Sequence, residues 1–222
     1  MTKPLPALTA GFALAAFTFG APSPTPTLVA GSSPLGIQAQ ASPALAGLPV
    51  KGRAPMTGYS RDQFGGGWRD PDGNGCNARQ DVLGRQAVAG TEQRAGTHRC
   101  VTSAVIVDPY SGAQLSSPGA DIDHIVAEGD AWQTGAQQLT QQQRTALAND
   151  PLELIATSAH LNRAKGDGDA ATWLPPLKTF RCAYVARQIA VKRKYRLWVT
   201  APERDSMTRV LSGCPAQTLP TT

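Results

Sequence analysis

The chain has 222 residues and a formal net charge of +5 at pH 7, and this length suits one or two domains. No apolar run is long enough to span a membrane, which argues against an integral membrane protein. The net charge hides a division, because residues 121–169 carry eight acidic and three basic residues whereas residues 178–209 carry nine basic and two acidic ones. This division suits a protein that binds cations in one place and a polyanion in another.

The first part of the chain does not have the composition of folded protein. Lys3 is the only charged residue before Lys51, and Ala7–Ala21 is an apolar run rich in Ala, Leu and Phe, which is typical of a signal peptide. The following segment is rich in Pro, Ser, Ala and Gly, so it buries too little apolar surface to offset the entropy of ordering. The sequence therefore predicts a signal peptide (1–30), a disordered, flexible leader (31–54), one domain (55–216) and a tail (217–222).

Helix-capping signals divide the domain into elements. Capping boxes begin at Asn77, Thr140 and Thr200, and Ser158 precedes a helix that Gly166 ends. Short β-branched or apolar runs predict strands between these helices. The expected helices are 77–89, 140–148, 158–166, 180–196 and 200–213, and the expected strands are 100–107, 121–126 and 152–157. This order predicts a helix-rich α+β domain with a strand–strand–helix unit at its centre.

The chain has three histidines, and one of them lies in the acidic stretch DIDHIVAEGDAW. Asp123 and His124 lie in the second expected strand, Asn149 precedes the third, and Asn162 and Lys165 lie on the helix after it. Asp121 and Asp130 are interpreted as supporting residues, and His160 is a further candidate metal ligand.

This constellation resembles the HNH nuclease motif, a ββα-metal unit. The segments DIDHIV, ANDPLELIATSAHLNRAKGD and WLPP are similar to the HNH family found in secreted bacterial proteins and at the C-termini of some modification-dependent restriction endonucleases. The segments CNARQDVL and CAYVARQIAVKRKYRL match that family as well, so the resemblance covers about residues 59–214. One departure is Ala127, which stands where the family commonly has proline.

The resemblance implies a division of labour that suits the residue types. Asp123 and Asn162 supply oxygen ligands for Mg²⁺, which prefers hard oxygen donors and stabilises the leaving oxygen of a cleaved phosphodiester. His124 points to the other side of the strand and accepts a proton from water as a general base. Asn149 orients His124 or ties the loop between the strands to it. Mn²⁺ remains an alternative cation.

Basic residues provide the candidate substrate contacts. Arg79 lies in a segment that matches the family, although a structural salt bridge is an equal alternative. Lys165 is a candidate phosphate contact or a helix-end lysine in solvent. A basic run near Trp198 suits phosphate backbone and base stacking, with a solvated helix face as its alternative, and it comprises Lys192, Arg193, Lys194 and Arg196.

The four cysteines form no Cys-x-x-Cys pair, which argues against a zinc cluster. Export favours disulfides, and three pairings exist. We favour Cys76–Cys100 and Cys182–Cys214, because each closes a local loop; free thiols are the alternative.

The sequence thus predicts a secreted, metal-dependent HNH endonuclease that cuts DNA without sequence specificity. It leaves open whether RNA is also cut, which cation is used, and the oligomeric state. A phosphodiesterase of small substrates is a weaker alternative. A different class of protein is an extracellular calcium- and polyanion-binding module with a decayed nuclease site, because Asp70–Asp81 has the outline of a calcium loop, although a Gly/Asn turn is favoured.

Overall fold

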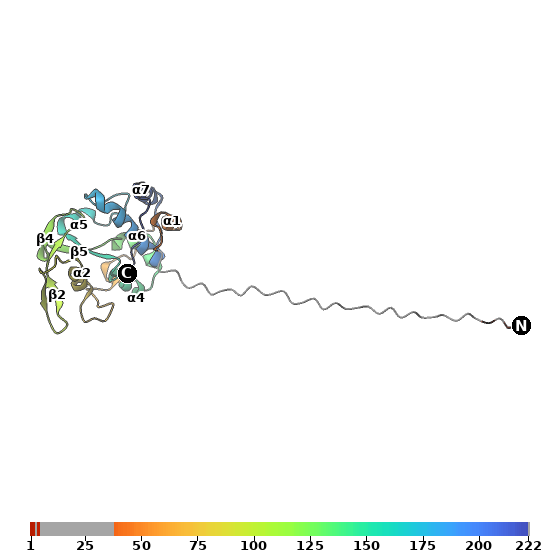
Figure 1. The fold of residues 1–222 in the computed structure, drawn as a ribbon, viewed down its shortest axis with the longest axis horizontal. Helices are drawn as coiled ribbons and strands as arrows, with labels where there is room; N and C mark the ends of the chain where they lie inside the picture. The colour runs from red at the N-terminus through yellow and green to blue at the C-terminus, as the bar shows by residue number, and fades with distance from the viewer. Residues whose placement is uncertain (3, 5–37, 222) are drawn as a thin grey trace. The chain divides into compact units, whose positions relative to one another are not determined.

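The computed structural model describes residues 1–2, 4 and 38–221, and every helix and strand lies in the unit Ile37–Thr222 (Figure 1). The predicted signal peptide falls almost wholly outside the described residues. The α-helices are α1 (Ala41–Ala46), α2 (Ala78–Gln86), α3 (Glu128–Gln133), α4 (Gln141–Ala148), α5 (Ala159–Lys165), α6 (Arg181–Lys194) and α7 (Ala201–Ser212). The strands are β1 (Gln93–Ala95), β2 (Cys100–Ser103), β3 (Val105–Val107), β4 (Gln114–Ser116), β5 (Ala120–His124) and β6 (Leu154–Ser158). Short 3-10 turns are η1 (Arg61–Phe64), η2 (Ser117–Gly119), η3 (Ala136–Gln138) and η4 (Lys178–Phe180).

The predicted α+β class is confirmed. The strands form three antiparallel pairs, β1–β2, β3–β4 and β5–β6. The central pair runs from Ala120 opposite Ser158 to His124 opposite Leu154, and α5 follows β6 directly. The Ser158 hydroxyl accepts the Leu161 N–H at 3.2 Å and caps α5. The sequence therefore folds locally into the expected strand–strand–helix unit.

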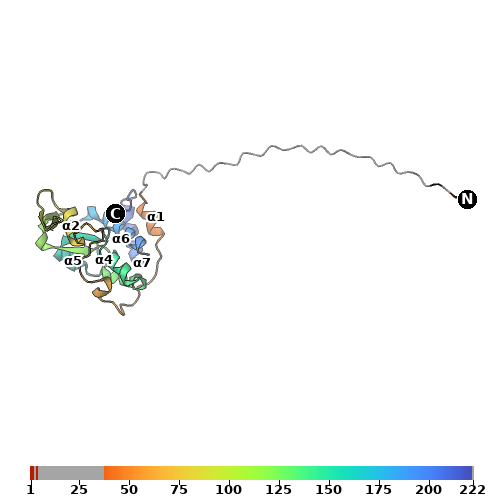
Figure 2. The same cartoon turned by 90° about the horizontal axis from the view of Figure 1, so that it is seen from below.

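Two hydrophobic clusters hold this unit in place. The smaller cluster contains Ile122 of β5 with residues of α2, β2, β3 and β6. The larger one joins α1, α3, α4, α6 and α7. Figures 1 and 2 show α1, α6 and α7 together on one side of the domain, and α2 and α5 on the other. Ile155 of β6 belongs to the larger cluster and Ile122 of β5 to the smaller one. The central unit is thus supported from both sides. Among the described residues, no helix combines the length and the apolar character needed to cross a membrane.

The predicted domain boundaries need correction at both ends. Residues 38–54, expected to be part of a flexible leader, contain α1, which packs on α6 and α7. The buried residues of α1 follow helical spacing and are Ala41, Ala44 and Leu45. Leu48, just after the helix, is buried as well. The expected tail, 217–222, pairs with this segment, since the Leu219 N–H donates to the Ala39 carbonyl at 2.8 Å. The sequence did not predict this helix, because the segment before Lys51 has almost no charged residues.

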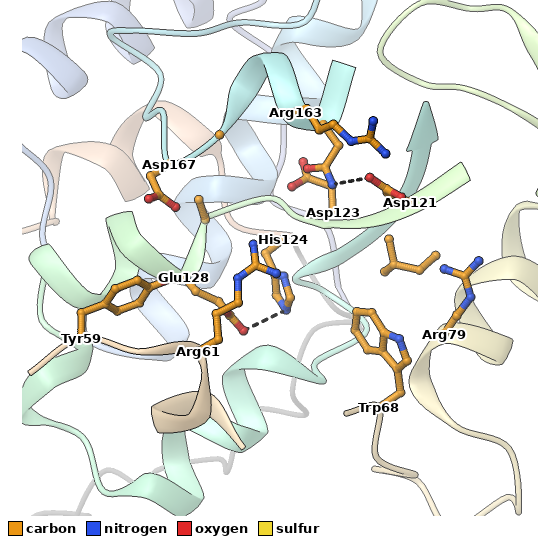
Figure 3. Close-up of a pocket in the computed structure, with 14 residues that line it drawn as sticks. Tyr59, Arg61, Trp68, Arg79, Asp121, Asp123, His124, Glu128, Arg163 and Asp167 are labelled. Atoms are coloured by element: carbon orange, nitrogen blue, oxygen red, sulfur yellow. Dashed lines mark hydrogen bonds and ion pairs between the residues drawn. The ribbon is translucent and has the colours of Figure 1, made fainter. Parts of the chain in front are cut away.

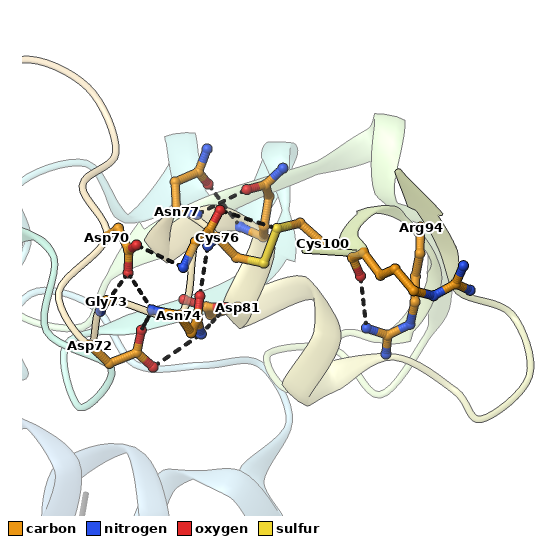
Figure 4. The surroundings of a disulfide bond; sticks show 12 residues. Asp70, Asp72, Gly73, Asn74, Cys76, Asn77, Asp81, Arg94 and Cys100 are labelled. Atoms are coloured by element: carbon orange, nitrogen blue, oxygen red, sulfur yellow. Dashed lines mark hydrogen bonds between the residues drawn. A yellow bond between two sulfur atoms is a disulfide. The ribbon is translucent and has the colours of Figure 1, made fainter. Parts of the chain in front are cut away.

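Both expected disulfides, Cys76–Cys100 and Cys182–Cys214, are present. The first lies beside the loop that begins at Asp70 (Figure 4). The Asp70 carboxylate accepts the N–H groups of Gly73 and Gly75 at 2.8 and 2.9 Å, and the Gly75 hydrogen bond is the main cause that lowers the pKa of Asp70. These contacts are those of a tight Gly/Asn turn closed by its own backbone.

Candidate active site

A cavity of about 580 Å³ lies over the end of β5 (Figure 3). Its walls come from the η1 segment, α2, β5, the start of α3 and the end of α5. It brings together five of the residues that the sequence singles out, which are Arg79, Asp121, Asp123, His124 and Asn162. The cavity is therefore the candidate active site.

His124 is held on several sides. Its Nε2 atom lies 2.9 Å from the Ala148 carbonyl oxygen and 3.8 Å from Glu128 Oε1. The indole of Trp68 is stacked beside its ring, with centroids 6.0 Å apart. Burial lowers the pKa of His124, while the charge of Glu128 and the Ala148 carbonyl oppose that shift. A neutral ring that donates from Nε2 to the carbonyl leaves Nδ1 free to accept a proton.

Asp123 is anchored by two buried groups. Its Oδ1 atom lies 2.9 Å from Lys165 Nζ, and its Oδ2 atom accepts the Tyr110 hydroxyl at 2.5 Å. Lys165 also donates to the His124 carbonyl at 2.7 Å, and its side chain is fully buried. The prediction of Lys165 as a substrate contact is therefore wrong, because the ammonium group faces inward and fixes Asp123 and the end of β5.

The side chain of Asn162 forms its hydrogen bond with Asp121. The Asn162 Nδ2 atom donates to Asp121 Oδ2 at 3.2 Å. An ionised carboxylate can only accept hydrogen bonds, so this contact turns the amide nitrogen toward Asp121 and leaves the amide oxygen available. Asp121, Asp123 and Asn162 thus supply oxygen atoms to one cavity, which is the donor set that a hard divalent cation requires.

Among the described residues, the side chain of Asn149 forms hydrogen bonds with Arg69 and Thr145 and none with His124. This buried side chain accepts the Arg69 N–H at 2.7 Å and donates to the Thr145 carbonyl at 3.0 Å. The preceding residue, Ala148, provides the carbonyl that contacts His124. Asn149 therefore ties the segment that carries Trp68 to the loop before β6.

Three arginines line the cavity. Arg61 and Arg163 have no ion-pair or hydrogen-bond partner among the described residues, and Arg79 contacts only the Ala120 carbonyl, at 3.4 Å. Sequence reasoning missed Arg61 and Arg163 as site residues, together with Trp68, Glu128 and Tyr59. Arg163 and Glu128 stand inside the segments that carry the motif, so their positions were the available signal, whereas Tyr59, Arg61 and Trp68 come from a loop without a motif.

The basic run of α6 lies outside this cavity. Lys192 is fully buried and pairs with Asp130 at 3.0 Å and Glu203 at 2.7 Å, so its prediction as a substrate contact is wrong. Lys194 pairs with Asp150 at 2.6 Å. Arg193 and Lys194 line a different cavity beside Leu219, and Arg196 lines none of the cavities described here. Lys192 and Lys194 are thus paired with acids, whereas Arg193 and Arg196 are exposed and form no ion pair with the described residues.

A second acidic group, Asp130, Asp169 and Glu203, is buried and has ligand atoms within 4.8 Å of one another. Two cationic side chains already occupy it, since Lys192 contacts Asp130 and Glu203 while Arg53 contacts Asp130 at 3.1 Å and Asp169 at 2.7 Å. Burial raises the pKa of Glu203 to about 7, against the opposing charge of Lys192. These groups form an ion-pair network that joins the N-terminal segment to α3, α6 and α7.

Residues 81–210 match the family described as GmrSD restriction endonucleases, C-terminal domain. The chain belongs to this family. The HNH resemblance is thereby confirmed, and the domain is nuclease-like. The chain is also similar to an uncharacterized secreted protein of Arthroderma benhamiae, with 38% identity over 197 residues that cover 87% of this chain and 91% of the relative. No solved structure matches the chain.

The family match separates two parts of the HNH site. Asp123, His124, Asn149 and Asn162 all lie within the matched residues, whereas the loop with Arg61 and Trp68 precedes them. That loop is nevertheless joined to the HNH unit by the hydrogen bond between the Arg69 N–H and Asn149. The matched unit and the preceding loop therefore form one site.

Proposed function

We propose that the protein is an exported, metal-dependent HNH endonuclease that hydrolyses phosphodiester bonds of DNA without sequence specificity. The observation that carries this proposal is one cavity in which a half-buried histidine, three oxygen-donor side chains and three arginines meet. Two disulfides and the similarity to a secreted protein support export.

His124 is the proposed general base. Its Nδ1 atom accepts a proton from the attacking water, and the Ala148 carbonyl keeps that atom unprotonated beforehand by holding the hydrogen on Nε2. The nearby Glu128 carboxylate stabilises the ring once it is protonated. Trp68 limits rotation of the ring from its other side.

Asp123 and Asn162 are the proposed ligands of Mg²⁺, with Mn²⁺ as a substitute, and Asp121 sets the orientation of Asn162. The residues fit this cation, because each carboxylate oxygen of Asp123 has further lone-pair positions beyond those used by Lys165 and Tyr110. A bound divalent cation would neutralise charge on the leaving oxygen.

Arg61, Arg79 and Arg163 are the proposed phosphate contacts. Their guanidinium groups form no ion pair with the described residues, so they need not break one to receive an anion. Arginine also matches phosphate geometry with paired N–H donors. These residues replace the α6 run as the predicted path of the nucleic-acid backbone; RNA would meet the same contacts.

The deciding experiment incubates the purified protein with supercoiled plasmid, with Mg²⁺, with Mn²⁺ and with excess EDTA. We expect nicking and linearisation with either cation, and their loss in EDTA. Asn162→Ala is the matched inactive variant, and it excludes a contaminating nuclease. Full cleavage in EDTA would contradict the metal-dependent mechanism. An intact plasmid with hydrolysis of a small phosphodiester would favour the small-substrate enzyme, and inactivity on both would favour a binding module.

A further inference from the structure

A second cavity, of about 250 Å³, is also lined by His124. It shares Arg61, Trp68, His124 and Glu128 with the larger cavity. Asp62 and the glycine loop 65–67 line it as well. Any group held there would therefore lie directly beside the proposed base.

The unpaired polar groups of the residues that line this cavity include both hydrogen-bond donors and an acceptor. Gly65 and Gly67 have positive φ values of 78° and 79°, a conformation that glycine adopts without strain. Among the described residues, no acceptor receives the N–H groups of Gly66, Gly67 or Trp68. The carboxylate of Asp62 likewise has no hydrogen-bond or ion-pair partner in the described part of the chain. The residues that line the cavity thus carry unpaired donors, an unpaired acceptor and an indole ring.

This mixture selects the kind of ligand. A phosphate group has only acceptors, so it could pair with Arg61 but would also meet the carboxylates of Asp62 and Glu128, which repel it. A purely apolar ligand would leave the N–H groups and Asp62 without partners. A nucleobase has donors, acceptors and an aromatic face. In guanine, the N1–H and N2–H₂ donors lie side by side and suit one carboxylate, while O6 accepts an N–H group.

We propose that this cavity holds one unpaired guanine base next to the phosphodiester that is cut. The proposal rests on the proposed nuclease function, because the base belongs to the chain that crosses His124. In a duplex, the edge of guanine that would face Asp62 is paired with cytosine. The preferred substrate class is therefore single-stranded or locally unpaired nucleic acid, and Arg61, which lines both cavities, contacts the phosphate between them.

Binding of mononucleotides tests the cavity without cleavage. Calorimetry on the full-length protein in EDTA would compare dGMP with dIMP, which lacks the N2 amino group, and with inorganic phosphate. We expect dGMP to bind roughly tenfold more tightly than dIMP, and phosphate to bind more weakly than either. Asp62→Asn should remove the preference for dGMP. Asp205→Asn, an exposed control with 65% side-chain exposure, should keep it. Equal binding of dGMP and dIMP by the unaltered protein would overturn the proposal, as would an unchanged preference in Asp62→Asn.

A second measurement separates this proposal from the nuclease function. Sequencing of the ends produced from a random single-stranded library should show guanine enriched beside the cut, with faster cleavage than of the same sequences in duplex form. Cleavage without that enrichment would refute the base site and leave the nuclease function intact. Preferential dGMP binding by a protein that cuts nothing would support the base site and refute the nuclease function.

Discussion

The basic residues at the end of α6 and the arginines around the HNH cavity differ in what they contact. On α6, Lys192 is enclosed by carboxylates and Lys194 is paired with Asp150. Around the cavity, Arg61 and Arg163 contact no acid among the described residues. The α6 residues form a continuous run in the sequence, whereas the cavity arginines come from three separate segments. Arg193 and Arg196 of the run are exposed and form no ion pair with the described residues, so positive charge that is free to bind phosphate comes from the scattered set and from only part of the run.

The physical reason is the cost of burying charge. A buried ammonium group requires opposite charges around it, and the acids that surround Lys192 come from α3 and α7, distant in sequence. Those acids remove Lys192 from any role at the surface. Local charge density therefore says little about function until the partners of each charge are known.

The largest expected effect is a loss of turnover, which we expect for a change in the HNH cavity and not for one in α6. His124→Ala removes the proposed base and leaves both sets of basic residues intact. We expect turnover to fall by about 10²–10⁴-fold, measured on plasmid, with DNA affinity nearly unchanged in a binding assay. Lys192→Met should leave turnover per folded molecule level. A His124→Ala protein with full activity would remove the central residue from the mechanism.

The second prediction concerns stability, which we expect to depend more on the buried Lys192 network than on the residues of the HNH cavity. Lys192→Met leaves Asp130 and Glu203 buried without their ammonium partner. Loss of one partner of a buried ion pair costs about 3–5 kcal/mol, to be measured by urea unfolding. Arg193→Gln, one position along the same helix and exposed, is the control and should change stability by about 0.5 kcal/mol or less. Equal small effects of both variants would mean that Lys192 is not the centre of a buried network.

Much of the fold could be predicted from local signals. The capping boxes at Asn77, Thr140 and Thr200 are formed by both side chains in each case. These signals involve residues close together in the sequence, so they need no knowledge of the tertiary structure. By contrast, α1 depends on contacts with α6 and α7, and only its burial reveals it.

The site could be predicted where the motif fixes its spacing. The ends of β5 and α5 bring His124, Asp123 and Asn162 to one cavity, as the motif indicates. The loop with Arg61 and Trp68 reaches the same cavity through a hydrogen bond between Arg69 and Asn149, which are 80 positions apart. The inward direction of Lys165 also depends on tertiary contacts, namely those with Asp123 and the His124 carbonyl. Such long-range contacts leave no local pattern.

The third prediction uses the pH dependence of the α6 network. Burial raises the pKa of Glu203 from its ordinary value of 4.5 to about 7, with Lys192, Asp130 and Asp169 also facing it. The folded protein then binds this proton more tightly than the unfolded chain does. The stability that Glu203 contributes through this proton is fully present below pH 4.5 and is lost as the pH rises through about 7. Urea unfolding between pH 5 and 8 should show this decline. Glu203→Gln should flatten it, whereas Asp205→Asn, on the same helix but exposed, should not.

The smallest effects come from single arginines, and they test the comparison most directly. Arg61→Gln, Arg79→Gln and Arg163→Gln each remove one proposed phosphate contact, so each should reduce the slope of log affinity against log salt by roughly 0.9 on duplex DNA. Arg193→Gln and Arg196→Gln remove the same charge from exposed positions outside the HNH cavity and are the matched controls.

Binding is measured in EDTA, so that cleavage does not interfere. Long-range attraction depends on net charge and is equal in all five variants, whereas counterion release depends on direct contact. A reduced salt slope in the cavity variants alone would place the nucleic-acid backbone over His124. A reduced slope in the α6 variants alone would place the nucleic acid on α6 and contradict the path proposed here.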